Sequence, residues 1–555
     1  MASTLENFTT GSTIATDDFI VGYDTAVLGG ERKWRYNTIV NSLSADALIA
    51  AKGSTTKRAL DDRFADGLTP KDFGADPSLP DNTTAIQNWL NSGGNLQGTA
   101  GTYVVTSTLN IPNNNTVING NGMEITYNTS SRTSVIEVIN RSHITINNLK
   151  INGRKDLKTP TGAHRAYGFD FQNCSNVIVD GCYVQNTIEH GIRVGIAESV
   201  AAADSVNIKI VNNTCYECGN TTTLRGSGIW FYGRVKNYVI SNNICLDCPI
   251  LGIGIDDSHS LPNLDVERGV VNGNITYSSL GIITGTDGMY TTGIGYSGNR
   301  QICMTNNVSF GYARGMSMTS VQARTQTGYS EISGNYFEAL KRGVVLRNLQ
   351  YLNFSNNTVL ATDSSDIDDW CILAYSDDSF DADSYLKSVK ISNNLCYAFR
   401  KGINVNEYST GSKWADDITI SGNRVVFTGV TPIISSTQRG IMIEETTGNS
   451  RPGKVYVTNN IVTGFYDGIY FVTATPTYCI GNIVEDCANW GIRTNNGTFA
   501  IVSRNTCRNN TTADFAVSTT GNVATTVFKD NEAFSTTKID QPGVPATTKQ
   551  NNLGF

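Results

Sequence analysis

The stretch SVKISNNLCYAFRKGINVNE (388–407) contains the whole pattern from which the fold is predicted. A short alternating run, VKIS (389–392), ends at Asn393-Asn394, and a second run, GINV (402–405), follows a few residues later. Apolar and polar residues that alternate over about four or five positions between Asn and Gly predict short strands with one buried face. Asn and Gly tolerate the left-handed backbone conformation that turns a chain between strands. We therefore predict two short strands joined by a tight turn.

The asparagine at the end of the first run recurs about once every thirty residues, and such a period is the signature of stacked structural repeats. The interval changes by whole loops while the short segments persist, so we predict a coil with insertions at some of its corners. Side-chain amides one coil apart can then hydrogen-bond in a ladder. The recurring residues are Asn121, Asn148, Asn213, Asn243, Asn274, Asn307, Asn335, Asn357, Asn394, Asn423, Asn460, Asn482, Asn505 and Asn531.

The second run begins with a glycine and an apolar residue in each repeat. Its copies are HGIRV (190–194), SGIWF (227–231), LGIGI (251–255), LGIIT (280–284), RGMSM (314–318), RGVVL (342–346), KGINV (401–405), RGIMI (439–443), DGIYF (467–471) and WGIRT (490–494). The residue two places after the recurring asparagine is small or apolar in most repeats, which predicts a column that points inward. Together the two runs predict an all-β solenoid of parallel strands.

Composition agrees with this architecture and excludes several classes of protein. Hydrophobic residues make up 39% of the chain, with 53 Gly and 12 Pro, whereas long helices would need more Leu, Ala, Glu and Lys. The formal net charge is -7 and the pI is near 5.3, so we expect no nucleic-acid partner. No run of about eighteen apolar residues occurs, so we expect no membrane span.

Twelve cysteines raise the question of a metal site. Cys215-x-x-Cys218 and Cys245-x-x-Cys248 have the spacing of a paired zinc signature. The two pairs are one repeat apart, however, and Cys215 and Cys245 both belong to the inward column. A free cysteine behaves as a small apolar core residue, so we favour buried reduced thiols and expect no metal and no cofactor.

Two segments before the repeats predict short helices. Residues 1–53 carry no repeat, and STTKRALDDRFAD (54–66) has the Ser/Thr start and apolar spacing of a helix that could form a neck over 54–70. The segment DFGADPSLPDNTTAIQNWL (72–90) predicts a second helix that caps the open end of the solenoid.

The expected apolar face of the capping helix comprises Ala85, Ile86, Trp89 and Leu90. We expect the coils to span 71–534, with a polar tail at 535–555.

The capping segment also carries a family resemblance. The motifs DFGA (72–75), NTTAIQ (82–87) and GTY (101–103), followed by an Asn-Gly-rich stretch, resemble the opening of pectate-lyase-like right-handed β-helix proteins. With a head that lacks repeats, a neck and no visible secretory signal, the whole chain looks like a bacteriophage tailspike.

The resemblance implies a right-handed parallel β-helix, a head over 1–53 that attaches to the phage tail or baseplate, and a homotrimer on the virion, made in the host cytoplasm. It also implies binding of bacterial surface polysaccharide, capsule or O-antigen, and usually its cleavage.

Hydrolysis of a glycosidic bond uses two carboxylates, about 5–5.5 Å apart for retention and about 6.5–9.5 Å apart for inversion. Neighbouring coils lie about 4.8 Å apart, so acids in one column fall within these ranges. Five residues after the glycine of the second run, Asp257, Glu407 and Glu445 share a column, and Asp377 lies one place off. We predict Asp377, Glu407 and Glu445 as the acid/base set, with Asp256 and Asp257 as the second choice.

Alternatives to this acid set remain open. Glu189, Glu338 or a site between subunits could supply the acids. The Asp-rich segment 362–383 could instead be solvated or hold Ca²⁺.

Aromatic residues near the acids could hold sugar rings, because apolar ring faces stack on aromatic side chains. Trp370 and Tyr375 lie in the Asp-rich segment, and Trp230 and Tyr232 are predicted to point away from the buried Ile229 and Phe231. We expect all four to contact substrate.

The shortest repeat near the acids starts at Gly343, and longer repeats lie on either side, so we predict a groove floor there. Arg342, Arg347, Arg400 and Lys401 are close to this turn in sequence, and we expect Arg347 to contact substrate.

Two other functions fit the same scaffold. A polysaccharide lyase removes a proton beside a uronate carboxylate and needs Arg or Lys to stabilise the resulting charge, which the basic residues near Gly343 could supply. The chain could also bind glycan without cutting it. His190 is more consistent with a corner residue than with a base, and no Gly-x-Ser-x-Gly motif supports a deacetylase.

Overall fold

The computed structural model of the chain describes four short segments near the N-terminus and most residues from 67 on. The described ranges are 19–23, 31–35, 48–50, 57–59, 67–159, 166–195, 203–222, 225–256, 266–281, 291–298, 300–320, 329–362, 370–377, 385–407, 416–429, 437–445, 453–473, 476–495, 500–517, 526–536, 539–540, 549–550 and 552. The chain divides into two compact units, Met1–Thr69 and Pro70–Phe555, and each is described by itself.

The first unit contains two antiparallel strand pairs. β1 (Phe19–Tyr23) pairs with β2 (Glu31–Arg35), and β3 (Leu48–Ala50) pairs with β4 (Lys57–Ala59). The prediction of a neck helix over 54–66 is therefore wrong at β4, because the apolar β3 offers a strand with which these residues pair. The remainder of the predicted head and neck lies outside the described residues.

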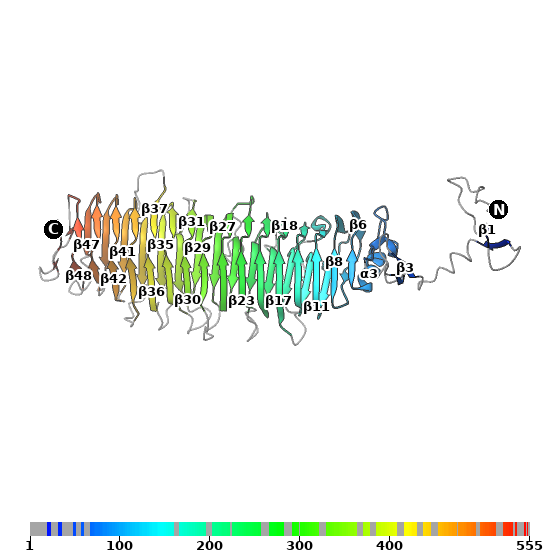
Figure 1. Cartoon of the computed structure of the whole chain (residues 1–555). Helices are drawn as coiled ribbons and strands as arrows, with labels where there is room; N and C mark the ends of the chain where they lie inside the picture. The colour runs from blue at the N-terminus through cyan, green and yellow to red at the C-terminus, as the bar shows by residue number, and fades with distance from the viewer. Residues whose placement is uncertain are drawn as a thin grey trace. The chain divides into compact units, whose positions relative to one another are not determined.

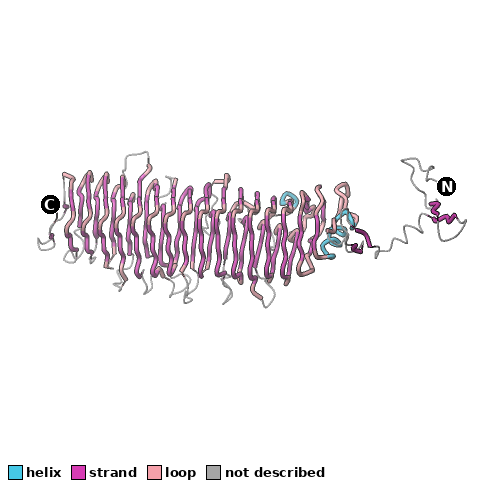
Figure 2. Tube along the Cα trace, in the orientation of Figure 1, coloured by secondary structure: helices cyan, strands magenta, loops and turns pink. Residues whose placement is uncertain are grey.

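The second unit is the predicted parallel β-helix, whose strands stack along one axis (Figure 1, Figure 2). Each coil gives one strand to each of three parallel ladders. The strands of the first ladder are β5 (Asn95–Gln97), β8 (Thr116–Asn119), β11 (Ser142–Asn147), β14 (Ser175–Asp180), β17 (Ser205–Val211), β20 (Val235–Ser241), β23 (Val266–Asn272), β26 (Arg300–Thr305), β28 (Ser330–Ser333), β30 (Gln350–Ser355), β33 (Lys387–Ser392), β36 (Asp416–Ser421), β39 (Val455–Thr458), β42 (Thr477–Ile480), β45 (Ala500–Ser503), β48 (Thr526–Lys529) and β51 (Lys549–Gln550).

The second ladder contains the strands that follow the recurring asparagines. They are β6 (Gly101–Val105), β9 (Met123–Tyr127), β12 (Lys150–Asn152), β15 (Tyr183–Gln185), β18 (Thr214–Tyr216), β21 (Ile244–Leu246), β24 (Ile275–Tyr277), β27 (Val308–Thr319), β29 (Tyr336–Arg347), β31 (Thr358–Ala361), β34 (Leu395–Ala398), β37 (Arg424–Phe427), β40 (Ile461–Thr463), β43 (Ile483–Glu485), β46 (Thr506–Arg508) and β49 (Glu532–Ala533). The long strands β27 and β29 continue into the third ladder.

The third ladder contains the strands with the glycine step. Besides β27 and β29 they are β7 (Leu109–Asn110), β10 (Ile136–Ile139), β13 (Phe169–Gln172), β16 (Ile192–Gly195), β19 (Ser227–Tyr232), β22 (Leu251–Asp256), β25 (Thr292–Ser297), β32 (Trp370–Ser376), β35 (Lys401–Glu407), β38 (Arg439–Glu445), β41 (Asp467–Val472), β44 (Trp490–Asn495), β47 (Ala513–Val517) and β50 (Ile539–Asp540).

A helix caps the N-terminal end of the stack, as predicted. The 3-10 turn η1 (Pro70–Phe73) and helix α3 (Thr83–Ser92) precede the first coil, and α3 lies at the end of the solenoid in Figure 1. Ile86, Trp89 and Leu90 are buried on one face of α3. Burying these side chains removes the apolar interior of the first coil from water.

The coils extend past the predicted end at residue 534. β50 pairs with β47, and β51 pairs with β48. The side chain of Asn552 accepts a hydrogen bond from the backbone of Asn531 at 2.8 Å, so one more partial coil covers the stack.

The turn between the first and second ladders, here called the first corner, has a constant form. From β11 on it consists of two residues, such as 148–149 or 242–243. The first of the two has positive φ in every coil and is most often Asn or Gly, for example Asn306 (56°) and Gly273 (66°). These residue types adopt this conformation at low cost, which explains why they recur.

The second residue of the first corner forms a continuous amide ladder from Asn213 to Asn552. The Oδ1 of Asn335 accepts the backbone N–H of Asn307 at 2.9 Å and its Nδ2–H at 2.9 Å. The same Nδ2 also donates to the carbonyl oxygen of Val271 at 2.9 Å. Each buried amide is thereby satisfied, and the pattern fixes the vertical register of the coils.

Two of the asparagines predicted for this ladder belong elsewhere. Asn148 has φ of 52° and is the left-handed first residue of its corner, while Leu149 and Cys182 precede Asn213 in the ladder position. Asn121 also has positive φ, and its side chain donates to Gln97 Oε1 at 3.0 Å. In these early coils the Asn-rich pattern marks the turn itself and not the buried amide.

The predicted inward column is buried throughout. Its members are Cys215, Cys245, Thr276, Ser309, Phe337, Val359, Cys396, Val425, Val462, Val484 and Cys507, which pair in register from coil to coil. All twelve cysteines lie in the described residues as free thiols, and all but Cys303 are buried. Burial raises the pKa of Cys182 to about 12, as expected for a thiol inside an apolar core.

Replacing Asn307 with alanine tests the amide ladder. Asn307→Ala removes the acceptor of the Asn274 backbone N–H, one of the two acceptors of the Asn274 Nδ2 and the side-chain donor to the Val271 carbonyl, so we expect a loss of about 3 kcal/mol or more in the free energy of unfolding. Equilibrium unfolding in urea measures the change. Asn306→Gly is the matched control in the same corner and should alter stability by about 0.5 kcal/mol or less, because Gly273 and Gly334 occupy this position in adjacent coils. Equal midpoints for the two variants would show that the ladder does not stabilise the fold.

Candidate functional site

The outer face of the third ladder, here called the bordered face, lies between two corners at which many coils have long connections. At the corner that enters this ladder, long connections include 278–291, 362–369 and 428–438. At the corner that leaves it, they include 257–265, 320–329, 377–386, 408–415 and 446–454. Loops on a rigid scaffold are where binding residues concentrate, so this face is the best candidate for a functional site.

The coil of β29 lies between two such long connections and has none itself where it leaves the third ladder. The coils of β10, β13, β19 and β25 also have none at this corner. β29 ends at Arg347 and β30 begins at Gln350, so two residues join them. The coils on either side carry the connections 320–329 and 377–386 at the same corner. The short turn between longer ones that was predicted near Gly343 is therefore present, and a groove floor at this place stays a prediction.

The register of the third ladder brings the predicted acids together. Glu407 of β35 pairs directly with Glu445 of β38. Ser376 of β32 pairs with Glu407, so Asp377 lies one residue beyond the position below it. Paired parallel strands lie about 4.8 Å apart, which places the three backbones within the range of a carboxylate pair. The side chains of Glu407 and Glu445 lie outside the described part of the structure.

Asp377 is held by Arg347, which was predicted to contact substrate, and by Asn348, which was not. Its Oδ2 accepts a hydrogen bond from Arg347 Nη2 at 2.5 Å in an ion pair. The Arg347 guanidinium lies 5.6 Å from the ring centroid of Tyr375. Asn348 fixes the backbone, because its Oδ1 accepts the N–H of Asp377 at 2.6 Å and its Nδ2 donates to the Asp377 carbonyl at 2.7 Å. The structure thus brings Asp377, Arg347 and Tyr375 together.

The second choice of acids forms a separate place on the same face. Asp256 lies beside Tyr232 in register and four coils from Tyr375, which corresponds to about 19 Å along the axis. Asp256 therefore cannot act on the same bond as Asp377. Asp257 lies outside the described residues.

Trp370 belongs to an apolar cluster on the outer face, and its exposed fraction is 3%. Leu373, Met442 and Tyr470 complete the buried part of this cluster, hereafter the Trp370 cluster. The ammonium of Lys401 lies 4.4 Å from the Trp370 ring centroid. The indole is consequently covered, unlike the open stacking surface that its place in sequence suggested.

Asp467 is a buried acid on this face that sequence reasoning missed. Its Oδ1 accepts a hydrogen bond from Asn489 at 3.0 Å, and Arg439 Nε is 4.0 Å from its Oδ2. Burial raises the pKa of the Asp467 carboxyl above its ordinary value, although the nearby Arg439 and Arg493 oppose the shift. A buried carboxyl with a raised pKa has the properties of a proton donor. Asp467 pairs in register with Arg439 at the start of β38, however, whereas Glu445 lies at the end of that strand, so Asp467 is not part of the predicted acid set.

A signal for Asp467 exists in the sequence. It occupies the position before the glycine in DGIYF, where the other copies carry His, Ser, Leu, Arg, Lys or Trp. An acid in this position stands out from the repeat, but the repeat pattern does not show that it is buried or that Arg439 and Arg493 lie near it. Arg439 and Arg493 lie 4.3 and 5.0 Å from the Tyr470 ring centroid.

The predicted pair Trp230 and Tyr232 projects outward, as expected, and forms a second aromatic cluster. The two ring centroids are 4.8 Å apart. Ile229, before Trp230, and Phe231, between the two aromatic residues, are buried. His190 stacks on Trp230 at 4.0 Å, which places it within the outer aromatic surface.

Charged side chains lie buried next to this aromatic surface. Arg193 pairs with Asp170 at 2.8 Å, and both side chains are almost fully buried.

The alternative acids have structural partners. Glu189 forms a buried ion pair with Arg132 at 3.0 Å. Glu338 accepts a hydrogen bond from Tyr336 at 2.8 Å on the second ladder, away from the third-ladder face. Among the described residues, no cluster of three or more His, Cys, Asp or Glu side chains has the arrangement of a metal site.

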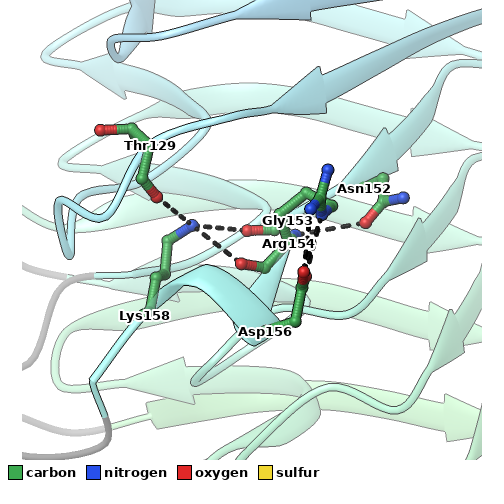
Figure 3. Close-up of polar contacts among 6 residues, drawn as sticks. All are labelled: Thr129, Asn152, Gly153, Arg154, Asp156 and Lys158. Carbon is green, nitrogen blue, oxygen red and sulfur yellow. Dashed lines mark hydrogen bonds and ion pairs between the residues drawn. The ribbon is translucent and has the colours of Figure 1, made fainter.

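Lys158 is another titratable group with a shifted pKa, and Figure 3 shows its surroundings. Its Nζ donates to the carbonyl oxygens of Gly153, Thr129 and Arg154 at 2.6, 3.3 and 3.4 Å (Figure 3). Burial lowers its pKa to about 8. Because three carbonyl groups accept its protons beside the short helix η2 (Lys155–Leu157), Lys158 holds this turn in place and has the features of a structural residue.

The fold and the bordered face thus define a parallel β-helix protein with a candidate site on one side. No protein-family model matches the chain, and no curated protein matches its sequence. Among the described residues, no helix is long and apolar enough to span a membrane.

Solved structures that resemble the chain include bacteriophage tailspike proteins, another bacteriophage gene product and epimerase modules. The tailspike protein of the E. coli bacteriophage HK620, in complex with a pentasaccharide, is 13% identical with a TM-score of 0.48, covering 93% of this chain and 84% of its own. The A-module of the Azotobacter vinelandii mannuronan C-5 epimerase AlgE4 is 16% identical with a TM-score of 0.45, covering 74% and 96%. The pre-mature gene product 12 of bacteriophage phi29 is 12% identical with a TM-score of 0.48, covering 84% and 62%. Such low identities say nothing about individual side chains.

The raised pKa of Asp467 predicts a pH-dependent stability difference. In the folded chain this pKa exceeds the ordinary value of 3.8, so the stability that the carboxyl contributes is fully present below that value and is lost as the pH rises through the folded pKa. Asp467→Asn removes the titration and keeps an oxygen for Asn489. We expect the variant to gain stability relative to the wild type between about pH 4 and pH 7, in thermal melts across this range.

The control for this experiment is Asp417→Asn, an exposed position with left-handed backbone on the first ladder. It should show no such trend. A constant difference between Asp467→Asn and the wild type across the same pH range would contradict the assignment.

Proposed function

We propose that the chain is a bacteriophage tailspike that binds a bacterial surface polysaccharide, capsule or O-antigen, and hydrolyses it on the outer face of the third ladder. The observation that carries the proposal is the register that gathers Asp377, Glu407 and Glu445 on a face bordered by insertions. A polymer that lies along the axis would cross successive coils and meet these acids in order.

The chemistry proposed for these acids is that of a glycoside hydrolase. One carboxylic acid protonates the leaving oxygen, and a carboxylate either attacks the sugar or activates a water. Glu407 and Glu445 are one coil apart, about 4.8 Å, which suits retention, whereas Asp377 and Glu445 are about two coils apart, which suits inversion. Arg347 holds Asp377 in position, and Tyr375 offers a ring for a sugar beside it.

The remaining parts of the proposal concern assembly. The head over residues 1–53 attaches the chain to the phage tail or baseplate, three copies form the spike on the virion, and synthesis takes place in the host cytoplasm. These statements extend the resemblance of the sequence to tailspikes.

A lyase is the second candidate, and the cations on this face favour it. Lys401 and Arg439 both lie over aromatic rings of the Trp370 cluster, where they could stabilise the charge formed beside a uronate carboxylate. A receptor that holds glycan without cutting it is the third.

Incubation with purified host polysaccharide separates these functions. For a hydrolase we expect falling viscosity without the ultraviolet absorbance of an unsaturated uronate, because water completes the cleavage. Falling viscosity with that absorbance would establish a lyase. Retention of the polysaccharide without any loss of viscosity would establish a binder and rule out both enzymes.

Single replacements then test the acid set. Asp377→Asn, Glu407→Gln and Glu445→Gln each keep the shape of the side chain but remove its charge. We expect the depolymerisation rate to fall about 100-fold or more in each variant whose replaced acid takes part in the reaction. Asp417→Asn lies on the first ladder of the same coil as Glu407 and should keep full activity. Full activity in all three site variants would reject this acid set.

A further inference from the structure

Asn404 is a buried polar residue in an apolar part of the candidate face. It lies on β35 in register between Leu373 of β32 and Met442 of β38. Its exposed fraction is 0%, and neither its Oδ1 nor its Nδ2 has a hydrogen-bond partner. The mechanism proposed above makes no use of this residue.

The Trp370 cluster closes around Asn404. Trp370 and Leu373 come from β32, Met442 from β38 and Tyr470 from β41. The strand that carries Asn404, β35, lies between β32 and β38, so the members of the cluster lie on both sides of it. The four side chains supply mainly apolar surface, and the hydroxyl of Tyr470 accepts a hydrogen bond from Asn495 at 3.1 Å instead of from Asn404. The amide is therefore surrounded by groups that cannot replace the water it loses on burial.

A second amide on the same strand has a similar environment. Asn406, two residues further along the outer face of β35, is 4% exposed, and its Oδ1 also has no partner. Its Nδ2 donates to Glu444 at 3.3 Å. Two neighbouring amides with unused hydrogen-bonding atoms thus face the same side of the sheet.

Buried polar groups in native proteins are nearly always paired, and an exception indicates strain, a missing partner or a function. The ladder asparagines of this chain, such as Asn394 with partners on both amide atoms, show that the fold pairs buried amides where they serve stability. Asn404 is left unpaired in the same coils. Its orientation toward the bordered face points to a partner that comes from outside the chain.

We infer that Asn404 is a specificity-determining residue that recognises two adjacent hydroxyl groups of a sugar in the polysaccharide. One hydroxyl donates to Oδ1 and the next accepts from Nδ2, which uses the donor and the acceptor that the amide presents together. The apolar face of the same sugar ring packs against the Trp370 cluster. Entry of the sugar requires one of the covering side chains to rotate. The inference rests on the proposed function, because it names what that site selects.

Replacing Asn404 with leucine, whose side chain has the same number of heavy atoms and the same branching, gives two opposite expectations. Without a ligand, Asn404→Leu removes an unpaired amide from apolar surroundings, so the urea midpoint should rise. With the polysaccharide that the wild type depolymerises or retains, binding should weaken about tenfold or more, because two hydrogen bonds to the sugar are lost. A gain in stability with a loss in binding is the signature of a group kept for function and not for folding.

Asn394→Leu is the matched control, since it replaces a buried asparagine whose amide is paired, and its urea midpoint should fall. Asn404→Ala is the second variant, in case leucine is too bulky, and it should weaken binding to the same degree. A lower midpoint for Asn404→Leu would show that the amide has a structural partner and overturn the inference. Unchanged binding in both Asn404 variants would overturn it as well, while leaving the proposed function intact. Failure of the wild type to bind or cleave any polysaccharide would remove both.

Discussion

The vertical register of the coils is the constraint on which the rest of the molecule depends. It is set at the first corner, where a left-handed Asn or Gly turns the chain and the next asparagine bonds to its counterpart one coil away. Both ends of the amide are used, so a coil that slipped by one residue would leave buried amides unpaired along the whole stack. With that corner fixed, every residue of the third ladder has a defined neighbour above and below. The pairing of Glu407 with Glu445 on the third ladder therefore follows from the first corner, which joins the other two ladders.

This constraint explains which parts of the fold could be predicted from the sequence. The coil, its inward column and the capping helix depend on local patterns, and the structure confirms all three. The misassigned Asn148 shows the limit of such patterns, because left-handed and ladder asparagines are adjacent and look alike in the sequence. The neck helix failed at Lys57–Ala59 because a helical spacing does not reveal that a partner strand lies nearby.

The candidate site was predictable only in its backbone. Counting from the glycine step placed Glu407 and Glu445 in one column, and it placed Asp377 one position off, because ladder position is a property of the repeat. The surroundings of a side chain are not a property of the repeat. Trp370 is covered by neighbours from several coils. The raised pKa of Asp467 comes from burial, which the nearby arginines oppose, and this burial is not part of the repeat pattern.

The same residue type therefore serves two ends in this chain. At the first corner, asparagine is buried with all of its partners inside the fold, and the corner tolerates no insertion from β11 on. On the third ladder, Asn404 is buried without partners, on a face whose both edges accept insertions. A rigid corner that fixes register makes it possible for the opposite corners to vary in length without disturbing the stack. If the third-ladder face recognises the polysaccharide as proposed, stability and recognition belong to different sides of one coil. An unpaired amide can then persist on the side where the register does not depend on it.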